Sequence, residues 1–266
     1  MHPTDYSDDG RIAFAHAVRL ALRGRYALSL LNIDTGNLSM HHTGVGEVVD
    51  CLIRWKMAPE KAGAEILEGE FKLPVLGVTI PANNVRVGVL DFLDNHLTDL
   101  VVIATRQHRG LSRWLERSLA LRTLSRASTL ALLIPEGARG FVDPATGVMK
   151  LERILVPVDD RVDLTVALDR LEAFVDGLGG GVEIKLLCVG PDASGLKLPQ
   201  GGKSYPLMLR EGPVAETILS VARRYSADLI AMPTAKRSGV VAALRGSVTA
   251  AILDDAQWAV LSLPAR

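Results

Sequence analysis

Short, uncharged apolar runs alternate with segments of helical periodicity along this chain, and the alternation occurs twice. In the first half, strands are predicted at residues 26–33, 74–80, 99–105 and 129–134, and helices at 11–23, 47–67, 84–96 and 113–126. Pro59 is expected to break the second of these helices. Because buried strands separated by helices are typical of parallel sheets with crossover connections, the sequence predicts an α/β fold.

The second half repeats this order with less material. Strands are predicted at residues 154–158, 182–189, 204–209, 228–233 and 258–263, and helices at 164–175, 214–225 and 247–253. Residues 190–203 are rich in Gly, Pro and Ser where a further crossover helix would be expected, so a loop is predicted there. Between the halves, residues 143–147 carry a turn signal between short apolar flanks, which predicts a linking hairpin.

The length of 266 residues is enough for about two domains. We place a first domain at residues 1–136, a linking hairpin at 137–151 and a second domain at 152–266. The prediction is therefore two tandem open sheets, each with its own core and each parallel throughout.

A Pro-x-Asp motif stands near the start of each half, at residues 3–5 and again at 157–159. The second copy follows the apolar run of residues 154–156 and marks the carboxyl end of a first strand, where open α/β sheets place their ligands. The first copy has almost no strand before it. Either the natural start lies upstream of Met1, or the first domain lacks most of its first strand.

The bulk properties limit the class of partner. Thirty basic residues balance thirty acidic ones, so neither nucleic acid nor an anionic membrane is indicated as a partner. Cys51 and Cys188 lie far apart, lack the spacing of a zinc site, and are interpreted as buried thiols in a reducing compartment. No apolar run has the length of a membrane span, so a soluble, cytoplasmic protein is expected.

The clearest candidate for a binding site surrounds the start of the last helix. A basic and glycine-containing loop at residues 236–239 leads to Gly246 and Ser247. Glycines let the main chain approach an anion, and free N–H groups at a helix start favour negative charge, so phosphate is the natural ligand. Ser247 and Thr249 would cap the helix or donate to that phosphate. An ordinary strand-to-helix turn explains the same residues equally well.

Three stretches, "ILVPVDD", "REGPVAETILSVARRYSADLIAMP" and "SGVVAALRGSVTAAIL", resemble the universal stress protein family in its tandem two-domain form. The resemblance implies open five-stranded parallel sheets of the HUP/Usp-like kind, commonly dimerised through the last strand. It therefore implies an internal pseudo-dimer of the two halves, with further homodimerisation left open. It also implies a regulatory or protective role in stress response. Some members of the family bind ATP, and others do not.

Carried over residue by residue, the resemblance assigns a nucleotide site to the second domain, for ATP with Mg²⁺. Asp159 would contact the nucleoside, and Gly239, Gly246 and Ser247 would hold the phosphates. The full set of assigned residues is Pro157, Val158, Asp159, Val189, Met232, Lys236, Gly239, Gly246, Ser247, Val248 and Thr249. Pro233 and Lys236 stand where the family usually has glycine, which leaves the path of the phosphate loop in doubt.

The first domain departs further from the family pattern. In its corresponding loop only Gly110 and Ser118 match, and Gln107 and Arg117 replace expected glycines, so its main-chain contact to phosphate is predicted to be lost. "GGKS" at residues 201–204 imitates the end of a phosphate-binding loop, but a predicted strand follows it instead of a helix, so we reject it.

Three functions remain open at this point. The first is a nucleotide-responsive protein that uses the second domain. The second is a scaffold without nucleotide that binds a protein partner. The third, least favoured, is a nucleotide hydrolase or transferase, for which only Asp159 or Asp160 offers a general base. No catalytic residue and no metal site is assigned, and the balance is against an enzyme.

Overall fold

The computed structural model describes residues 1–7, 10–36, 44–105, 129–135, 137–138, 140–199, 203–234, 247–255 and 257–265. Within these ranges the first half contains β1 (His2–Pro3), α1 (Arg11–Gly24), β2 (Leu28–Asp34), α2 (Val45–Arg54), α3 (Glu65–Gly69), β3 (Val75–Pro81), α4 (Val85–Asn95), β4 (Leu100–Thr105) and β5 (Leu130–Pro135). The second half contains β6 (Arg153–Val158), α7 (Leu164–Gly177), β7 (Glu183–Val189), β8 (Leu207–Arg210), α8 (Val214–Tyr225), β9 (Leu229–Thr234), α10 (Ser247–Asp254) and β10 (Ala259–Pro264).

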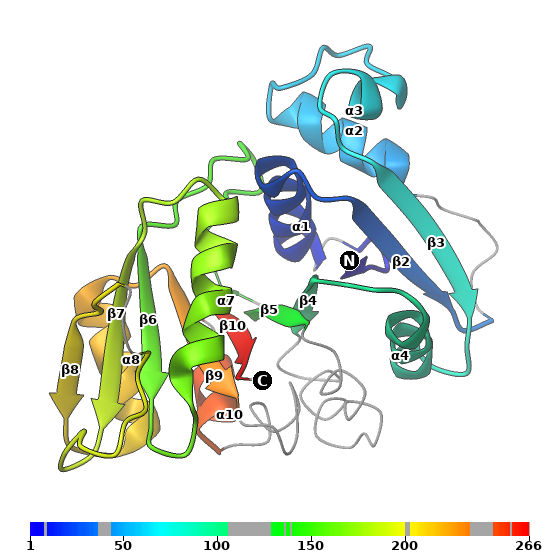
Figure 1. The fold of residues 1–266 in the computed structure, drawn as a ribbon. Helices are drawn as coiled ribbons and strands as arrows, with labels where there is room; N and C mark the ends of the chain where they lie inside the picture. The colour runs from blue at the N-terminus through cyan, green and yellow to red at the C-terminus, as the bar shows by residue number, and fades with distance from the viewer. Residues whose placement is uncertain are drawn as a thin grey trace.

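Both halves arrange their strands in the same spatial order. A sheet of seven strands has the order β4-β5-β10-β9-β6-β7-β8, and a sheet of three strands has the order β1-β2-β3. The two are joined at β1 and β4, because the terminal nitrogen of Met1 donates to the Leu100 oxygen at 2.8 Å and the Val102 N–H donates to the Met1 oxygen at 3.0 Å. Each half thus follows the order third, second, first, fourth and fifth strand (Figure 1).

The sheet is parallel within each half and antiparallel where the halves meet. There β5 pairs with β10, and Leu133 lies opposite Val260. The predicted fold class, two tandem open sheets with α/β connections, is confirmed. The parallel arrangement predicted within each half is thus confirmed, and the antiparallel pair lies between the halves.

The first strand of the first half is β1, which has only two residues. Asp5 follows it closely, just as Asp159 follows β6 directly. In the given chain the first strand is short, as predicted, and both Pro-x-Asp motifs lie at the carboxyl end of a first strand.

Successive residues of the central strands face two different cores, as the period of a β-strand requires. In β6, Ile154 and Val156 belong to the larger hydrophobic cluster, which α7 also lines, whereas Leu155 belongs to a second cluster with residues of α8. Helices therefore cover both faces of the sheet, which explains why β6 is apolar at nearly every position.

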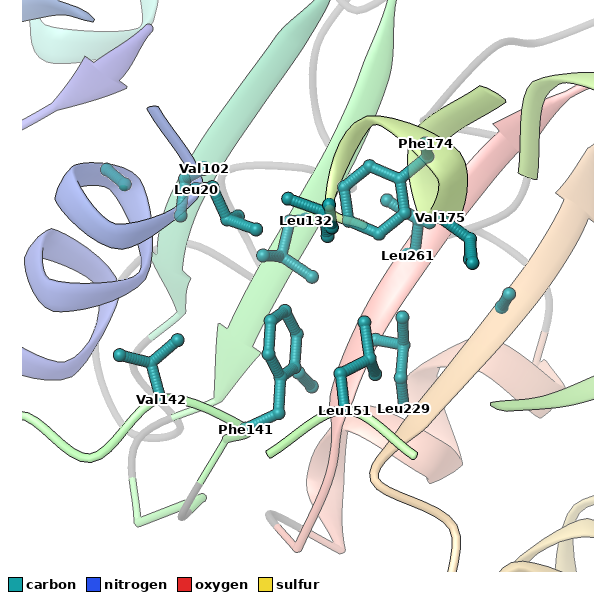
Figure 2. Packing of buried hydrophobic residues seen from close by; sticks show 14 of the residues in the cluster. Leu20, Val102, Leu132, Phe141, Val142, Leu151, Phe174, Val175, Leu229 and Leu261 are labelled. Carbon is teal, nitrogen blue, oxygen red and sulfur yellow. The ribbon is translucent and has the colours of Figure 1, made fainter. Parts of the chain in front are cut away.

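The linking segment is part of the larger core. Phe141, Val142 and Leu151 pack between α1 and the seam of β5 and β10 (Figure 2). The segment turns as the sequence predicts, since the Asp143 N–H donates to the Val148 oxygen at 2.9 Å and Gly147 donates back to Asp143 at 2.8 Å. The side chains of this segment pack in one hydrophobic cluster with residues of both halves.

The indole of Trp55 supports this hairpin from the end of α2. Its Nε1 donates to the Pro144 oxygen at 3.1 Å, and a Cβ added at Gly147 would lie 2.3 Å from the indole Cδ2. Gly147 also has a φ of +69°, which favours glycine. Trp55 and Trp258 are both buried, whereas Trp114 lies outside the described residues.

Two predicted elements differ in extent from the observed ones, and a third lies outside the described residues. The helix predicted at 47–67 is two helices, because α2 ends at Arg54, before Pro59, and α3 begins only at Glu65. The strand predicted at 204–209 is the shorter β8, and the helix predicted at 113–126 lies outside the described residues.

Both cysteines are free and buried. None of the helices in the described ranges is long and apolar enough to cross a bilayer.

Candidate functional site

The hydrogen bonding between β6 and β9 stops halfway along these strands. β6 pairs with β7 from Arg153 to Val158, but it pairs with β9 only at Ile154 and Leu155. Pro157 has no N–H to donate, which removes one bond from the ladder. The strands therefore separate toward their carboxyl ends, at the point where the strand order reverses. Open α/β sheets bind ligands at such points.

Several residues assigned from the sequence meet at this edge of the sheet. Val158 is paired with Cys188, so Asp159 and Val189 follow side by side. Met232 lies two residues beyond Ile230, the last partner of β6 on β9. Val189, Met232 and Val248 all pack against the same hydrophobic cluster, which is also the ordinary role of such apolar side chains. The carboxyl ends of β6, β7 and β9 thus converge with α10.

The anion-binding part of the assigned site is only partly described. α10 begins at Ser247, as predicted. Lys236, Gly239 and Gly246 lie outside the described residues, and so do the side chains of Ser247 and Thr249. In the first half, Gln107, Gly110, Arg117 and Ser118 lie outside them as well.

The Asp159 carboxylate is bound by an arginine that the sequence analysis did not consider. Arg161 donates from Nε to Oδ2 at 2.9 Å and from its main-chain N–H to Oδ1 at 3.0 Å, and Nη2 also contacts Oδ2. This hydrogen bond and the carboxylate charge raise the pKa of Arg161. The side chains of Arg161 and Asp159 are 81% and 40% exposed, and exposed pairs contribute about 0–1 kcal/mol. A ligand can therefore displace the arginine at little cost.

The electrostatic environment beside Asp159 is acidic. Burial raises the pKa of the Cys188 thiol, and the carboxylates of Asp192, Asp159 and Asp160 raise it further. Asp192 accepts hydrogen bonds from the Ser194 hydroxyl at 2.8 Å and main-chain N–H at 3.0 Å, which lower the pKa of its carboxyl group.

The loop that replaces the missing crossover helix lies against the turn after β6. The Leu164 N–H donates to the Lys197 oxygen at 3.1 Å. A Cβ added at Gly195 would lie 3.0 Å from the Asp160 Cβ, so the main chain of this loop closely approaches the second aspartate of the motif. Asp163 caps α7 by accepting from the Thr165 N–H at 3.0 Å. These contacts fix the main chain on one side of the candidate site.

The first half differs at the corresponding position. Counted from the Pro-x-Asp motif, His2 corresponds to Val156, and its Nδ1 donates to the Val102 oxygen of β4 at 2.9 Å. Burial lowers the pKa of His2 to about 4, so the ring is neutral near pH 7. A side chain thus connects β1 to β4 at the position where, in the second half, Val156 has no pairing with β9. No spacing or charge pattern in the sequence indicates this buried histidine.

The described residues contain no group of three or more His, Cys, Asp or Glu side chains arranged to hold a metal ion. The described residues of this edge offer the Asp159 carboxylate and main-chain groups, beside the partly buried side chains of Val189 and Met232.

Residues 193–264 match the family model described as "Universal stress protein family". No curated protein matches the chain. Among solved structures, it resembles a universal stress protein from Archaeoglobus fulgidus DSM 4304 at 14% identity, with a TM-score of 0.57 over 99% of this chain and 94% of the other. It also resembles a putative universal stress protein from Pseudomonas aeruginosa UCBPP-PA14 at 16% identity, with a TM-score of 0.57 over 99% and 91% of the two chains.

A third resemblance is to the cytoplasmic domain of a prokaryotic cation chloride cotransporter, at 13% identity with a TM-score of 0.51 over 99% of this chain and 94% of the other. At these identities the similarities concern the fold alone. They extend over both halves, whereas the family model covers only the segment from the loop after β7 to the end of β10.

Proposed function

We propose that the whole chain is a universal stress protein of the tandem two-domain form, with a regulatory or protective role in stress response in the cytoplasm. The family match in the second half supports this, together with the repeated strand order. The first half, which the family model does not cover, has the same order of strands around a shortened β1.

We further propose that the second half binds ATP with Mg²⁺. The observation that carries this proposal is the separation of β6 from β9 beyond Leu155. Asp159 would bind the nucleoside after release from Arg161, and Pro157, Val158 and Met232 would contribute main chain and apolar surface beside it. The phosphates would lie toward the start of α10, at Gly239, Gly246, Ser247 and Thr249, with Lys236 nearby.

The acidic surroundings of Asp159 make the cation part of the proposal. Asp160 and Asp192 add negative charge to this edge, which opposes a polyphosphate without its metal ion. Mg²⁺ binds through phosphate oxygens and keeps several waters, so it needs no dedicated set of protein ligands. Binding of ATP should accordingly depend strongly on Mg²⁺.

Isothermal titration of the full chain with ATP and Mg²⁺ tests the proposal. Saturable heat is expected for the natural sequence, and none for Gly246→Arg, whose side chain would occupy the phosphate position. Gly69→Arg is the matched control, because it makes the same substitution at an exposed position where an added side chain meets open space. Absence of heat from the natural sequence at millimolar ATP would contradict nucleotide binding.

The alternative is a scaffold without nucleotide that binds a protein partner. The observation in its favour is that Arg161 already binds the Asp159 carboxylate, which would otherwise contact the nucleoside. A protein partner that co-purifies with the chain from its own cells, together with an empty site at millimolar ATP, would support this alternative. A hydrolase or transferase is the least favoured function, and release of phosphate from ATP would be its signature.

A further inference from the structure

A hollow lies in the first half, at the carboxyl end of β1. It is formed by the segment that follows β1, the first turns of α1 and one side of α2, and its volume is about 180 Å³. Side chains with charges, hydroxyls and aromatic rings line it, among them Tyr6, Arg11, Phe14, Glu47, Asp50 and Arg54. None of these residues belongs to the nucleotide site proposed for the second half.

Unusual main-chain conformations at two residues shape this hollow. Tyr6 has a φ of +56°, a conformation that bulky residues rarely adopt, and Gly44 has a φ of +69° just before α2. A Cβ added at Gly44 would lie 2.5 Å from the Tyr6 hydroxyl oxygen, so this hydroxyl is packed against the main chain at the start of α2. The Tyr6 N–H is fixed by Thr4 Oγ1 at 3.0 Å. Such strained residues persist where the surrounding structure holds them, commonly at binding sites.

The charges on α2 are arranged unusually. Asp50 and Arg54 are four residues apart, the spacing at which opposite charges normally pair along a helix. Among the described residues, these two side chains form no ion pair with one another or with a third residue. Both are exposed and both line the hollow, with Glu47 one turn before Asp50. One helix thus presents acidic and basic groups separately to the same space.

The volume limits the ligand to a small molecule. At about 30 Å³ per water molecule, 180 Å³ corresponds to about six waters, below the range of about 300–1,000 Å³ of drug-sized ligand sites. A guanidinium binds a carboxylate through two parallel hydrogen bonds, carboxylates attract an ammonium group, and aromatic faces attract cations.

We propose that this hollow binds a small zwitterion of amino-acid size. The carboxylate of the ligand would contact Arg54, and its ammonium group would lie toward Asp50 and Glu47, beside the rings of Phe14 and Tyr6. The two charges of the ligand thus complement those of Asp50 and Arg54, the two residues of α2 that form no ion pair among the described residues. The hollow lies in the other half of the chain from the proposed nucleotide site, so its test does not depend on nucleotide binding.

Isothermal titration of the full chain with glycine and, separately, with glycine betaine tests the proposal. Saturable binding of at least one of them is expected, whereas acetate and methylammonium, which each carry one of the two charges, should bind at least about tenfold more weakly. Binding of glycine alone would identify a primary ammonium group as the preferred cation, and binding of glycine betaine alone a methylated one. Either result supports the proposal.

Arg54→Gln and Asp50→Asn are each expected to weaken binding about tenfold or more, because each removes one charge-assisted contact. Both residues are exposed, so folding should be retained, which circular dichroism checks. Lys61→Gln and Glu60→Gln remove exposed charges outside the hollow and should leave binding unchanged. The proposal is overturned if neither zwitterion binds at ~10 mM, if acetate binds as tightly as the zwitterion, or if both α2 variants bind normally.

Discussion

The buried ring of His16 predicts how the stability of the protein depends on pH. His16 lies in α1 with 0% of its surface exposed. Its Nδ1 donates to the Ile12 oxygen at 2.7 Å, and its Nε2 accepts from the N–H groups of Phe141 at 2.9 Å and Val142 at 3.1 Å. The ring is therefore neutral with its proton on Nδ1. Its two hydrogen bonds from Phe141 and Val142 hold the linking segment against α1.

Protonation of this ring would place a second proton at Nε2, facing two N–H donors. Burial lowers the pKa of His16 from 6.5 to about 4. At about 1.4 kcal/mol per pKa unit, the difference corresponds to about 3 kcal/mol of free energy of unfolding. The unfolded chain binds this proton below pH 6.5 and the folded chain only near pH 4. The contribution is therefore complete above pH 6.5 and is lost as the pH falls toward 4.

Urea denaturation followed by tryptophan fluorescence at pH 7 and pH 4.5 measures this effect. The variant His16→Gln cannot titrate, and its amide oxygen can accept from the linker N–H groups. At pH 7 it should be less stable by about 1–3 kcal/mol, because it satisfies the buried N–H groups less well. Between the two pH values it should lose about 2.5 kcal/mol less than the natural sequence.

The remaining loss in His16→Gln should reflect other groups, including His2, whose pKa burial also lowers to about 4. His96→Gln, which removes an exposed histidine, is the control for the loss of a histidine from the chain. An equal loss of stability between pH 7 and pH 4.5 in His16→Gln and the natural sequence would refute the reasoning.

Three further predictions concern other parts of the chain. Asp159→Asn should weaken binding of ATP with Mg²⁺ about tenfold, because it removes the charge that contacts the nucleoside. Arg161→Gln should strengthen binding by up to about fivefold, because the exposed ion pair that it removes contributes at most about 1 kcal/mol. Titration calorimetry compares both variants with the natural sequence. Gly147→Ala should lower the free energy of unfolding by about 1–3 kcal/mol, because the position has a positive φ and faces an indole ring. Gly10→Ala is the control and should leave the free energy of unfolding nearly unchanged in urea denaturation, because open space surrounds that position. Leu261→Ala, in the fully buried centre of β10, should lower the melting temperature and cost about 2–5 kcal/mol; a loss below about 1 kcal/mol would contradict its place in the core.

The order of elements could be predicted from the sequence because strands buried on both faces of the sheet are apolar at successive positions. The run from Ile154 to Val156 is apolar at each position, since its residues alternate between two cores. The end of α2 was harder to predict. The residues after Arg54 still suit a helix, but Trp55 turns under the linking hairpin and Lys56 adopts a φ of +58°. Contacts with a segment about ninety residues away decide that boundary.

The candidate site could be predicted only as an edge of the sheet. The Pro-x-Asp motif locates that edge correctly, because a strand end is a property of local sequence. The partner of Asp159 depends on the rotamer of Arg161, which no pattern specifies. His2 and His16 bond to main-chain groups 100 and 125 residues away, so their burial could not be inferred from their neighbours in the sequence.

The antiparallel seam between β5 and β10 determines which way each half faces. Strands that pair directly across this seam run in opposite directions, whereas strands within each half run parallel. The strands at the seam and the side chains of the linking segment belong to one hydrophobic cluster with residues of both halves. A substitution at Phe141 or Leu261 should therefore destabilise both halves together, and neither half should unfold without the other.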